Sequence, residues 1–193
     1  MTGFSEDPQA HYGAPRDKRS FLHWVQKQEG RFEFKDGRIV MHAGSTIRHA
    51  RILTGFLLGF SNRLDFKAWD VVSAQFAVEI GDDVRFPDVL VEKAGGNEYA
   101  ISTSNPIILV EVLSPSSVGR DLNVKLAEYT SLASLEAYIV ASQDEPIVWV
   151  WQRDAVTRTF PAKPLEIGGR DGAIEISALK LSLPLAELLR AVL

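Results

Sequence analysis

Apolar and polar residues recur at two different spacings along this 193-residue chain, and the spacings predict helices in some stretches and strands in others. Residues 46–64 carry apolar side chains at helical spacing, which predicts a long amphipathic helix. Residues 31–41 form two alternating runs around Asp36-Gly37, a pair that is typical of a β-hairpin turn. A short helix that ends near Gly30 is expected before this hairpin.

The middle of the chain is rich in predicted strands. Residues 71–80 alternate between polar and apolar side chains, which is typical of a half-buried strand. Residues 85–92 and 107–113 are mainly apolar and predict two buried strands that a surface loop connects. The elements expected after them are a helix over about 117–132, strands over 136–140 and 147–151, a meander, and a short helix over 184–193.

This succession predicts an α/β fold in which helices flank a mixed central sheet, with an N-terminal hairpin and a C-terminal β meander. The length suits one domain over residues 18–193. Residues 1–17 are polar and contain glycine and proline, so they are expected to form a flexible arm.

The composition narrows the class of protein. Hydrophobic residues make up 46% and charged residues 24%, as in globular proteins. A net charge of −4 argues against strong nonspecific affinity for nucleic acid, although it allows a locally basic face. The chain has no cysteine, which excludes disulfides and zinc–thiolate sites. It has neither an apolar signal segment nor a run near the ~18 residues of a membrane helix, so we expect a cytoplasmic protein without a membrane partner.

Two carboxylates stand out because each lies within an apolar run. Asp88 follows Pro87 in the run 85–92, and Glu111 lies in the run 107–113. An ionised carboxylate in a buried strand is costly to desolvate unless a positive charge compensates it. Two carboxylates on adjacent strands could share one such charge, and a divalent metal ion is the usual candidate.

A lysine is expected near this pair. Lys125 lies in the helix that follows the Glu111 strand, and it shares one face with Asp121 and Tyr129 at four-residue spacing. Two carboxylates can bind Mg²⁺ or Mn²⁺ with hard oxygen ligands, and the metal lowers the pKa of a bound water. A neighbouring ammonium group can stabilise the charge that develops in phosphodiester hydrolysis.

These residues resemble a known family. The chain is similar to the Uma2 family of endonucleases, within the PD-(D/E)XK or restriction-endonuclease-like superfamily, over roughly residues 20 to 190. The residues that carry the resemblance are Pro87-Asp88, the run Glu111-Val112-Leu113-Ser114-Pro115-Ser116-Ser117, and Asp121, Lys125 and Tyr129, with residues 32–41 and His49 upstream.

The resemblance implies a restriction-endonuclease-like fold and DNA as the substrate. It implies that Asp88 and Glu111 are the metal ligands and that Lys125 is the catalytic lysine. In most of the superfamily the lysine lies two residues after the acidic residue, where this chain has Leu113. Lys125 fits a known relocation of that lysine to the following helix. Because many of these nucleases cut both strands as pairs, the resemblance also allows a homodimer.

Further residues are candidates for supporting roles. Glu33 is a third acidic residue that could reach the metal, and His49 a residue that could contact a phosphate. Asp121 could orient Lys125 through their four-residue spacing. Basic residues on the long helix and before Lys125 are expected to form a local DNA-binding surface, namely Arg48, Arg51 and Arg120, with Arg63 further along the helix.

Each assignment has a simpler structural alternative. Asp88 could cap a turn at the end of a strand, and Glu111 could be a buried carboxylate paired with Lys125 or an arginine. Glu33 could lie on the exposed side of the hairpin, and His49 at the edge of the core. At the level of function, the alternatives to a DNA endonuclease are an inactive binding or assembly module with the nuclease fold, and a metal-dependent phosphoesterase that acts on small substrates.

Overall fold

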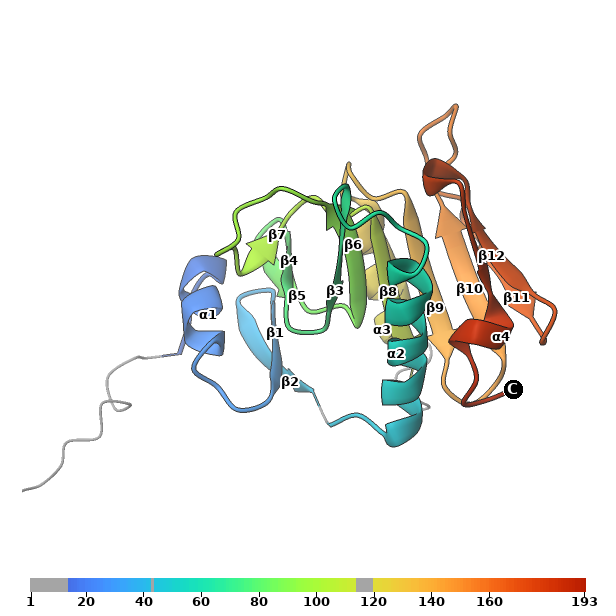
Figure 1. Ribbon diagram of the computed structural model, residues 1–193. Helices are drawn as coiled ribbons and strands as arrows, with labels where there is room; N and C mark the ends of the chain where they lie inside the picture. The colour runs from blue at the N-terminus through green and yellow to red at the C-terminus, as the bar shows by residue number, and fades with distance from the viewer. Residues whose placement is uncertain (1–13, 43, 114–119) are drawn as a thin grey trace, which may run out of the picture.

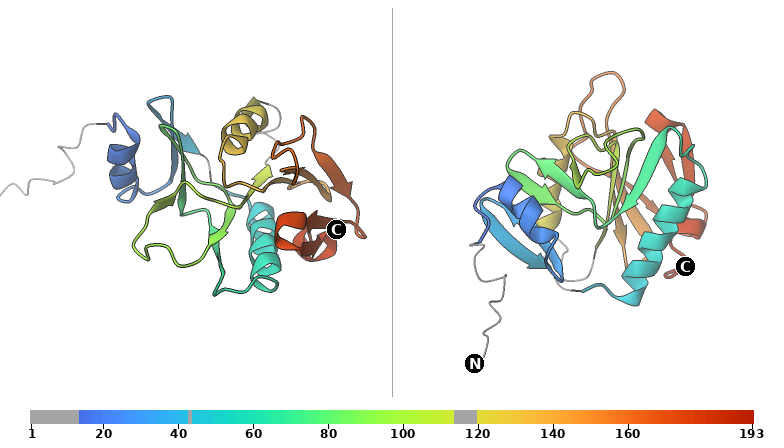
Figure 2. Two further views of the ribbon diagram at one scale, coloured as in Figure 1. Left: turned by 90° about the horizontal axis from the view of Figure 1, so that it is seen from above. Right: turned by 60° about the vertical axis from the view of Figure 1, so that its left-hand side comes forward.

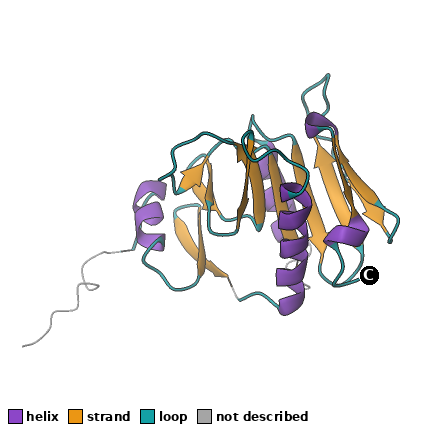
Figure 3. Cartoon of the chain, viewed as in Figure 1, coloured by secondary structure: helices purple, strands orange, loops and turns teal. Residues whose placement is uncertain are grey.

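The computed structural model describes residues 14–42, 44–113 and 120–193, without the side chains of residues 120–122. Within these residues the chain forms two mixed sheets, a separate two-stranded hairpin and four α-helices (Figures 1 and 3). None of the helices in this part of the chain is long and apolar enough to cross a membrane.

The smaller sheet contains the N-terminal hairpin and packs against helix α1 (Lys18–Val25). Asp36 and Gly37 connect β1 (Arg31–Lys35) to β2 (Arg38–His42) at φ angles of 48° and 73°, as the Asp-Gly pair predicts. The strands follow the order β2 (Arg38–His42), β1 (Arg31–Lys35), β5 (Asp83–Arg85), β4 (Ala77–Ile80) and β7 (Ser102–Thr103). Only the β4–β7 pair is parallel among the pairs that the structure describes in this sheet.

The larger sheet has six strands and carries most of the core. Their order is β11 (Leu165–Gly168), β10 (Ile147–Gln152), β9 (Ala137–Ser142), β8 (Ile108–Leu113), β6 (Val89–Lys93) and β3 (Trp69–Ser73). Strands β8 and β9 run parallel, and helix α3 (Arg120–Thr130) lies between them in the sequence. A parallel pair needs such a crossover connection.

Helices cover both faces of the larger sheet (Figure 2). Helix α2 (Ile47–Ser61) and the short helix α4 (Leu185–Leu188) pack on one face, together with the hairpin β12 (Ala173–Ile176) and β13 (Leu181–Pro184). Helix α3 packs on the other face, where Tyr129 contacts a separate buried cluster. Strand β8 alternates accordingly, with Val110 and Val112 towards α2 and Leu109 towards α3. Glu111 therefore points to the α3 side.

The expected mixed central sheet is present as the six-stranded sheet, but the chain also forms a second mixed sheet, and two predicted strands are each divided between the two sheets. Residues 71–80 form the end of β3 and, after a turn in which Gln75 and Phe76 both donate to the Ser73 carbonyl, strand β4. Residues 85–92 are divided at Pro87, between β5 and β6. Proline has no N–H for a ladder and restricts the residue before it. Asp88 consequently lies just before a strand rather than within one.

The C-terminal meander is also only partly present. Strand β11 extends the larger sheet, whereas β12 and β13 form their own two-stranded sheet. The helix expected over residues 184–193 is limited to four residues. The beginning of the helix expected over 117–132, and the serines of the run after Leu113, lie outside the described residues.

The contact between α2 and α4 generates a prediction about stability. A Cβ atom at Gly55 would meet the backbone carbonyl oxygen of Leu188. Helix propensity alone would make Gly55→Ala stabilising by ~1 kcal/mol. We expect the opposite, a loss of about 1–3 kcal/mol in the free energy of unfolding, because overpacking against backbone forces the two helices apart. Urea denaturation measures the difference.

The matched control is Gly44→Ala, since a Cβ at Gly44 meets no atom within 4 Å. Its unfolding free energy should lie within ~0.5 kcal/mol of the wild type. A Gly55→Ala protein that is more stable than the wild type would contradict the close packing of α2 on α4.

Candidate active site

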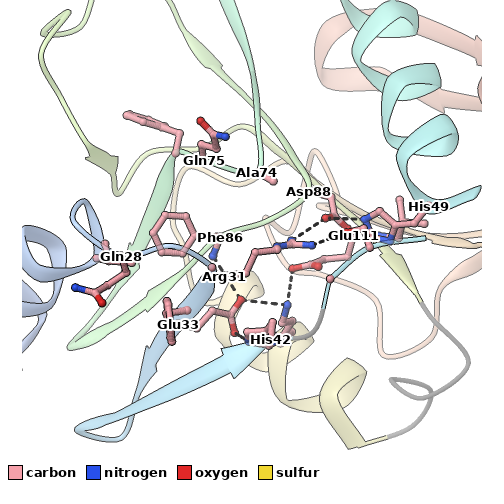
Figure 4. A pocket seen from close by; sticks show the side chains of 18 of the residues that line it. Gln28, Arg31, Glu33, His42, His49, Ala74, Gln75, Phe86, Asp88 and Glu111 are labelled. Carbon is pink, nitrogen blue, oxygen red and sulfur yellow. Dashed lines mark hydrogen bonds and ion pairs between the residues drawn. The ribbon is translucent and has the colours of Figure 1, made fainter. Parts of the chain in front are cut away.

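The candidate site is a cleft of about 1000 Å³ where the edge of the smaller sheet meets the ends of β6 and β8 (Figure 4). Side chains from both sheets, from α2 and from α3 line it. Asp88, Glu111 and Lys125 all line this one cleft, as do Glu33 and His49. The five residues come from five different parts of the chain, so the fold rather than local sequence brings them together.

Three donors hold the Asp88 carboxylate. Its Oδ2 accepts a hydrogen bond of 2.8 Å from the backbone N–H of Val112, and its Oδ1 lies 3.0 Å from His49 Nε2 and 3.1 Å from Arg31 Nη2. The residue is 1% exposed. Burial would raise the pKa of Asp88, but His49, the Val112 N–H and Arg31 together lower it below its usual value. Asp88 is therefore an anion at neutral pH.

Glu111 lies in β8 and points into the same cleft. Its Oε1 accepts hydrogen bonds of 2.8 Å from Lys125 Nζ and 2.8 Å from the Tyr129 hydroxyl. Burial raises the pKa of Glu111, and although Lys125 opposes this, the negative charges of Asp88 and Glu33 add to the increase. The surroundings of Glu111 therefore favour its protonated form more than water does.

Lys125 bridges two carboxylates. Its Nζ lies 2.8 Å from Glu111 Oε1 and 3.4 Å from Glu33 Oε1. Burial would lower the pKa of Lys125, but these two anions raise it above its usual value. Lys125 thus stays protonated at neutral pH, and its chemistry is electrostatic rather than that of a general base.

Glu33 is an anchor for this lysine. Its Oε2 accepts a hydrogen bond of 2.7 Å from Arg85 Nη1. His42 Nε2 also lies 3.0 Å from Oε2. Burial would raise the pKa of Glu33, yet His42, Lys125 and Arg85 outweigh it and hold the pKa well below its usual value.

The alternation of strand β1 explains this arrangement. Phe32 and Phe34 pack on the α1 side, so Arg31, Glu33 and Lys35 form a charged row on the opposite face. Arg31 contacts Asp88, Glu33 contacts Lys125 and Arg85, and Lys35 Nζ lies 3.2 Å from Glu128 Oε1. The row joins the smaller sheet to the cleft and to α3.

The remaining predicted residues lie elsewhere or are not described. Arg48 and Arg51 are exposed on α2 and do not line the cleft, and Arg48 pairs with Asp144 at 3.4 Å. Arg63 pairs with Glu187 at 2.8 Å. The side chains of Arg120 and Asp121 are outside the described residues, so their assigned roles stay predictions.

Sequence reasoning missed two arginines. Arg31 could have been noticed from the strict charged–aromatic alternation of residues 31–35, which places it on the face of Glu33. Arg85 is 4% exposed and lies between Glu33 and Glu128. The sequence feature that could have identified it is a charged residue inside an apolar run. The Tyr129 hydroxyl also donates a hydrogen bond to Glu111.

The donor set indicates which metal could be held. Among the described residues no group of three or more His, Asp or Glu side chains is placed to hold a metal ion. Asp88 and Glu111 offer two carboxylates in an open cleft. Mg²⁺ commonly binds one or two carboxylates and retains several waters, whereas structural zinc sites require four protein ligands. The residues therefore fit Mg²⁺ or Mn²⁺, with Asp88 and Glu111 as the ligands that we predict.

The buried position of Glu33 generates a prediction about stability. Glu33→Gln removes the anion that Arg85 and Lys125 share, and removal of one partner from a buried ion pair typically costs about 3 kcal/mol. The folded pKa of Glu33 lies below its ordinary value of 4.5, so its contribution is complete above that pH and is lost as the pH falls further. The melting temperature of the wild type should therefore fall more steeply between pH 5 and 3 than that of Glu33→Gln.

Glu187→Gln is the matched control, because Glu187 also pairs with an arginine at 2.8 Å but is 41% exposed. Surface pairs contribute little, so its melting temperature should stay close to that of the wild type. Equal losses in the two variants would show that Glu33 does not anchor the site.

Comparisons with known proteins bear on the fold and on the family of this chain. A crystal structure from Anabaena variabilis, described as "a putative nuclease belonging to DUF820", has the same fold with a TM-score of 0.70 and 14% identity, and the match covers 89% of this chain and 98% of that one. The "uncharacterized" Synechocystis proteins slr1290 and sll1609 are 26% and 24% identical over 125 and 128 residues. The match to slr1290 covers 63% of this chain and 66% of that relative, so this chain spans just under two thirds of its length. The match to sll1609 covers 62% of this chain and 72% of that relative.

The family model Uma2, described as "Putative restriction endonuclease", matches residues 19–175. This range includes both carboxylates, the lysine and the other residues of the cleft described above. The resemblance seen in the sequence is thereby confirmed, and the chain belongs to the Uma2 family.

Proposed function

We propose that this protein is a Mg²⁺-dependent endonuclease that hydrolyses phosphodiester bonds of DNA in the cleft lined by Asp88, Glu111 and Lys125. The observation that carries the proposal is the convergence of these three side chains, with Lys125 Nζ 2.8 Å from Glu111 and Asp88 in the same cleft. Membership of the Uma2 family, described as "Putative restriction endonuclease", supports the same function.

Asp88 and Glu111 would hold the metal ion, which supplies a water of lowered pKa and a Lewis acid when bound. The backbone N–H of Val112 fixes one oxygen of Asp88, and the Tyr129 hydroxyl fixes one oxygen of Glu111. Both carboxylates are thereby oriented before a ligand enters. Such preorganisation reduces the reorganisation needed during the reaction.

Lys125 would stabilise the negative charge that develops on the phosphate oxygens. Its raised pKa keeps it cationic, and its bonds to Glu111 and Glu33 hold the ammonium group at the wall of the cleft. Stabilisation of developing charge by a fixed cation is among the larger contributions to catalysis of phosphoryl transfer. The same raised pKa argues that Lys125 does not take a proton from the attacking water.

DNA contacts outside the cleft and a homodimer remain predictions. Arg48 and Arg51 lie on the exposed face of α2, where they could contact DNA phosphates beyond the cleft. With an overall charge of −4, the affinity for DNA should depend on such local groups rather than on the whole surface.

A nicking assay tests the proposal. We expect the purified protein to nick supercoiled plasmid with Mg²⁺ or Mn²⁺ and not with EDTA. Asp88→Asn, Glu111→Gln and Lys125→Met should each lower the rate by about 10²-fold or more, because each removes a charge from the reacting centre. Glu98→Gln changes an exposed carboxylate outside the cleft and should leave the rate unchanged.

The substrates separate the alternatives. If the protein hydrolyses bis(p-nitrophenyl) phosphate but does not nick plasmid, it is a phosphoesterase for small substrates. Lack of metal-dependent hydrolysis of either substrate would identify an inactive module with the nuclease fold. Nicking that survives in Glu111→Gln at the wild-type rate would remove the site assignment.

A further inference from the structure

Arg31 places a guanidinium group on the carboxylate that is predicted to hold the metal. Its Nη2 lies 3.1 Å from Asp88 Oδ1 (Figure 4). Its Nη1 lies 3.0 Å from the hydroxyl of Ser45. The Arg31 side chain is 36% exposed, whereas that of Asp88 is 2% exposed. A partly exposed cation thus covers the buried anion from the solvent side of the cleft.

The three groups that donate to Asp88 differ in how firmly the structure fixes them in place. The Val112 N–H belongs to strand β8 and is fixed by the ladder. His49 is buried in the first turn of α2, and its own backbone N–H is capped by Thr46. Arg31 has a long side chain that ends at the cleft opening, so it is the donor that can exchange for another cation.

Asp88 Oδ1 already accepts from Arg31 and His49, so a metal ion that binds this oxygen competes with Arg31, because both are cations. Metal binding at Oδ1 would displace Arg31. Of the described residues that line the cleft, only Arg31 and Lys125 are lysine or arginine. Lys125 stays bound to Glu111 and Glu33, so Arg31 is the cleft cation that becomes available.

We propose that Arg31 occupies the cation position on Asp88 when the metal is absent, and that it binds a phosphate of the nucleic acid when the metal displaces it. The planar fork of a guanidinium group matches two oxygens of a phosphate, which makes arginine well suited to this role. Arg31 is then a competitor of the metal and a partner of the substrate. This inference rests on the proposed function, because it assumes that the metal binds Asp88.

The proposal predicts effects of opposite sign in two binding measurements on Arg31→Gln. Affinity for Mn²⁺ without DNA, measured by electron paramagnetic resonance, should increase about two- to fivefold, as expected when one partly exposed competing charge is removed. Affinity for an oligonucleotide duplex in Ca²⁺ should decrease by a similar factor. The slope of log affinity against log salt should become shallower by about 0.9, since one phosphate contact is lost.

Two variants serve as controls. Arg170→Gln removes the same charge from an exposed turn outside the cleft and should change neither affinity. Arg31→Lys keeps the charge without the fork, so its Mn²⁺ affinity should stay near that of the wild type while its DNA affinity falls. Arg31→Lys also keeps the proposal testable if Arg31→Gln does not fold.

The outcomes distinguish this proposal from the function on which it rests. If the wild type binds Mn²⁺ and nicks DNA but Arg31→Gln binds Mn²⁺ with unchanged or weaker affinity, the displacement of Arg31 is wrong and the nuclease assignment stands. If Arg31→Lys is the only folded variant, a DNA affinity equal to that of the wild type overturns the phosphate contact. If the wild type binds no Mn²⁺, both proposals fail together.

Discussion

The structure depends on how three buried carboxylates are compensated where the two sheets meet. Glu33, Asp88 and Glu111 are each at most 7% exposed, and ionised carboxylates are costly to bury without partners. Lys125 from α3 pairs with Glu33 and Glu111, and Arg85 from β5 pairs with Glu33. Arg31 and His49 pair with Asp88. The ion pairs that line the cleft therefore also join the smaller sheet to the larger one. Stability and the candidate chemistry therefore rest on one network.

The surroundings affect the pKa values of Asp88 and Glu111 in opposite directions. The environment lowers the pKa of Asp88 and raises that of Glu111, although both line one cleft. Strongly perturbed carboxyl groups in a cleft are typical of functional sites. A purely structural ion pair would need no open cleft beside it. Burial raises the pKa of Glu111, and the negative charges of Asp88 and Glu33 add to the increase, which supports the proposal that the cleft binds a divalent cation.

Much of this site could be predicted from residue types, but the sheet arrangement could not. Glu111 in an apolar run and Lys125 on the next helix already indicated a charged cluster, and the structure places the two side chains in contact. The division of residues 85–92 was missed because hydrophobic periodicity is the same for one long strand and for two short strands in different sheets. Arg31 was missed for a related reason, since alternation gives two faces of a hairpin without showing which one meets Asp88.

The most direct test of the central claim is a crystal of the protein soaked in MnCl₂, with anomalous scattering used to locate the ion. The convergence of the two carboxylates predicts one strong peak in the cleft, bound by oxygens of both Asp88 and Glu111. Absence of a peak in the cleft, or a peak held by other residues while these two carboxylates keep their present partners, would contradict it.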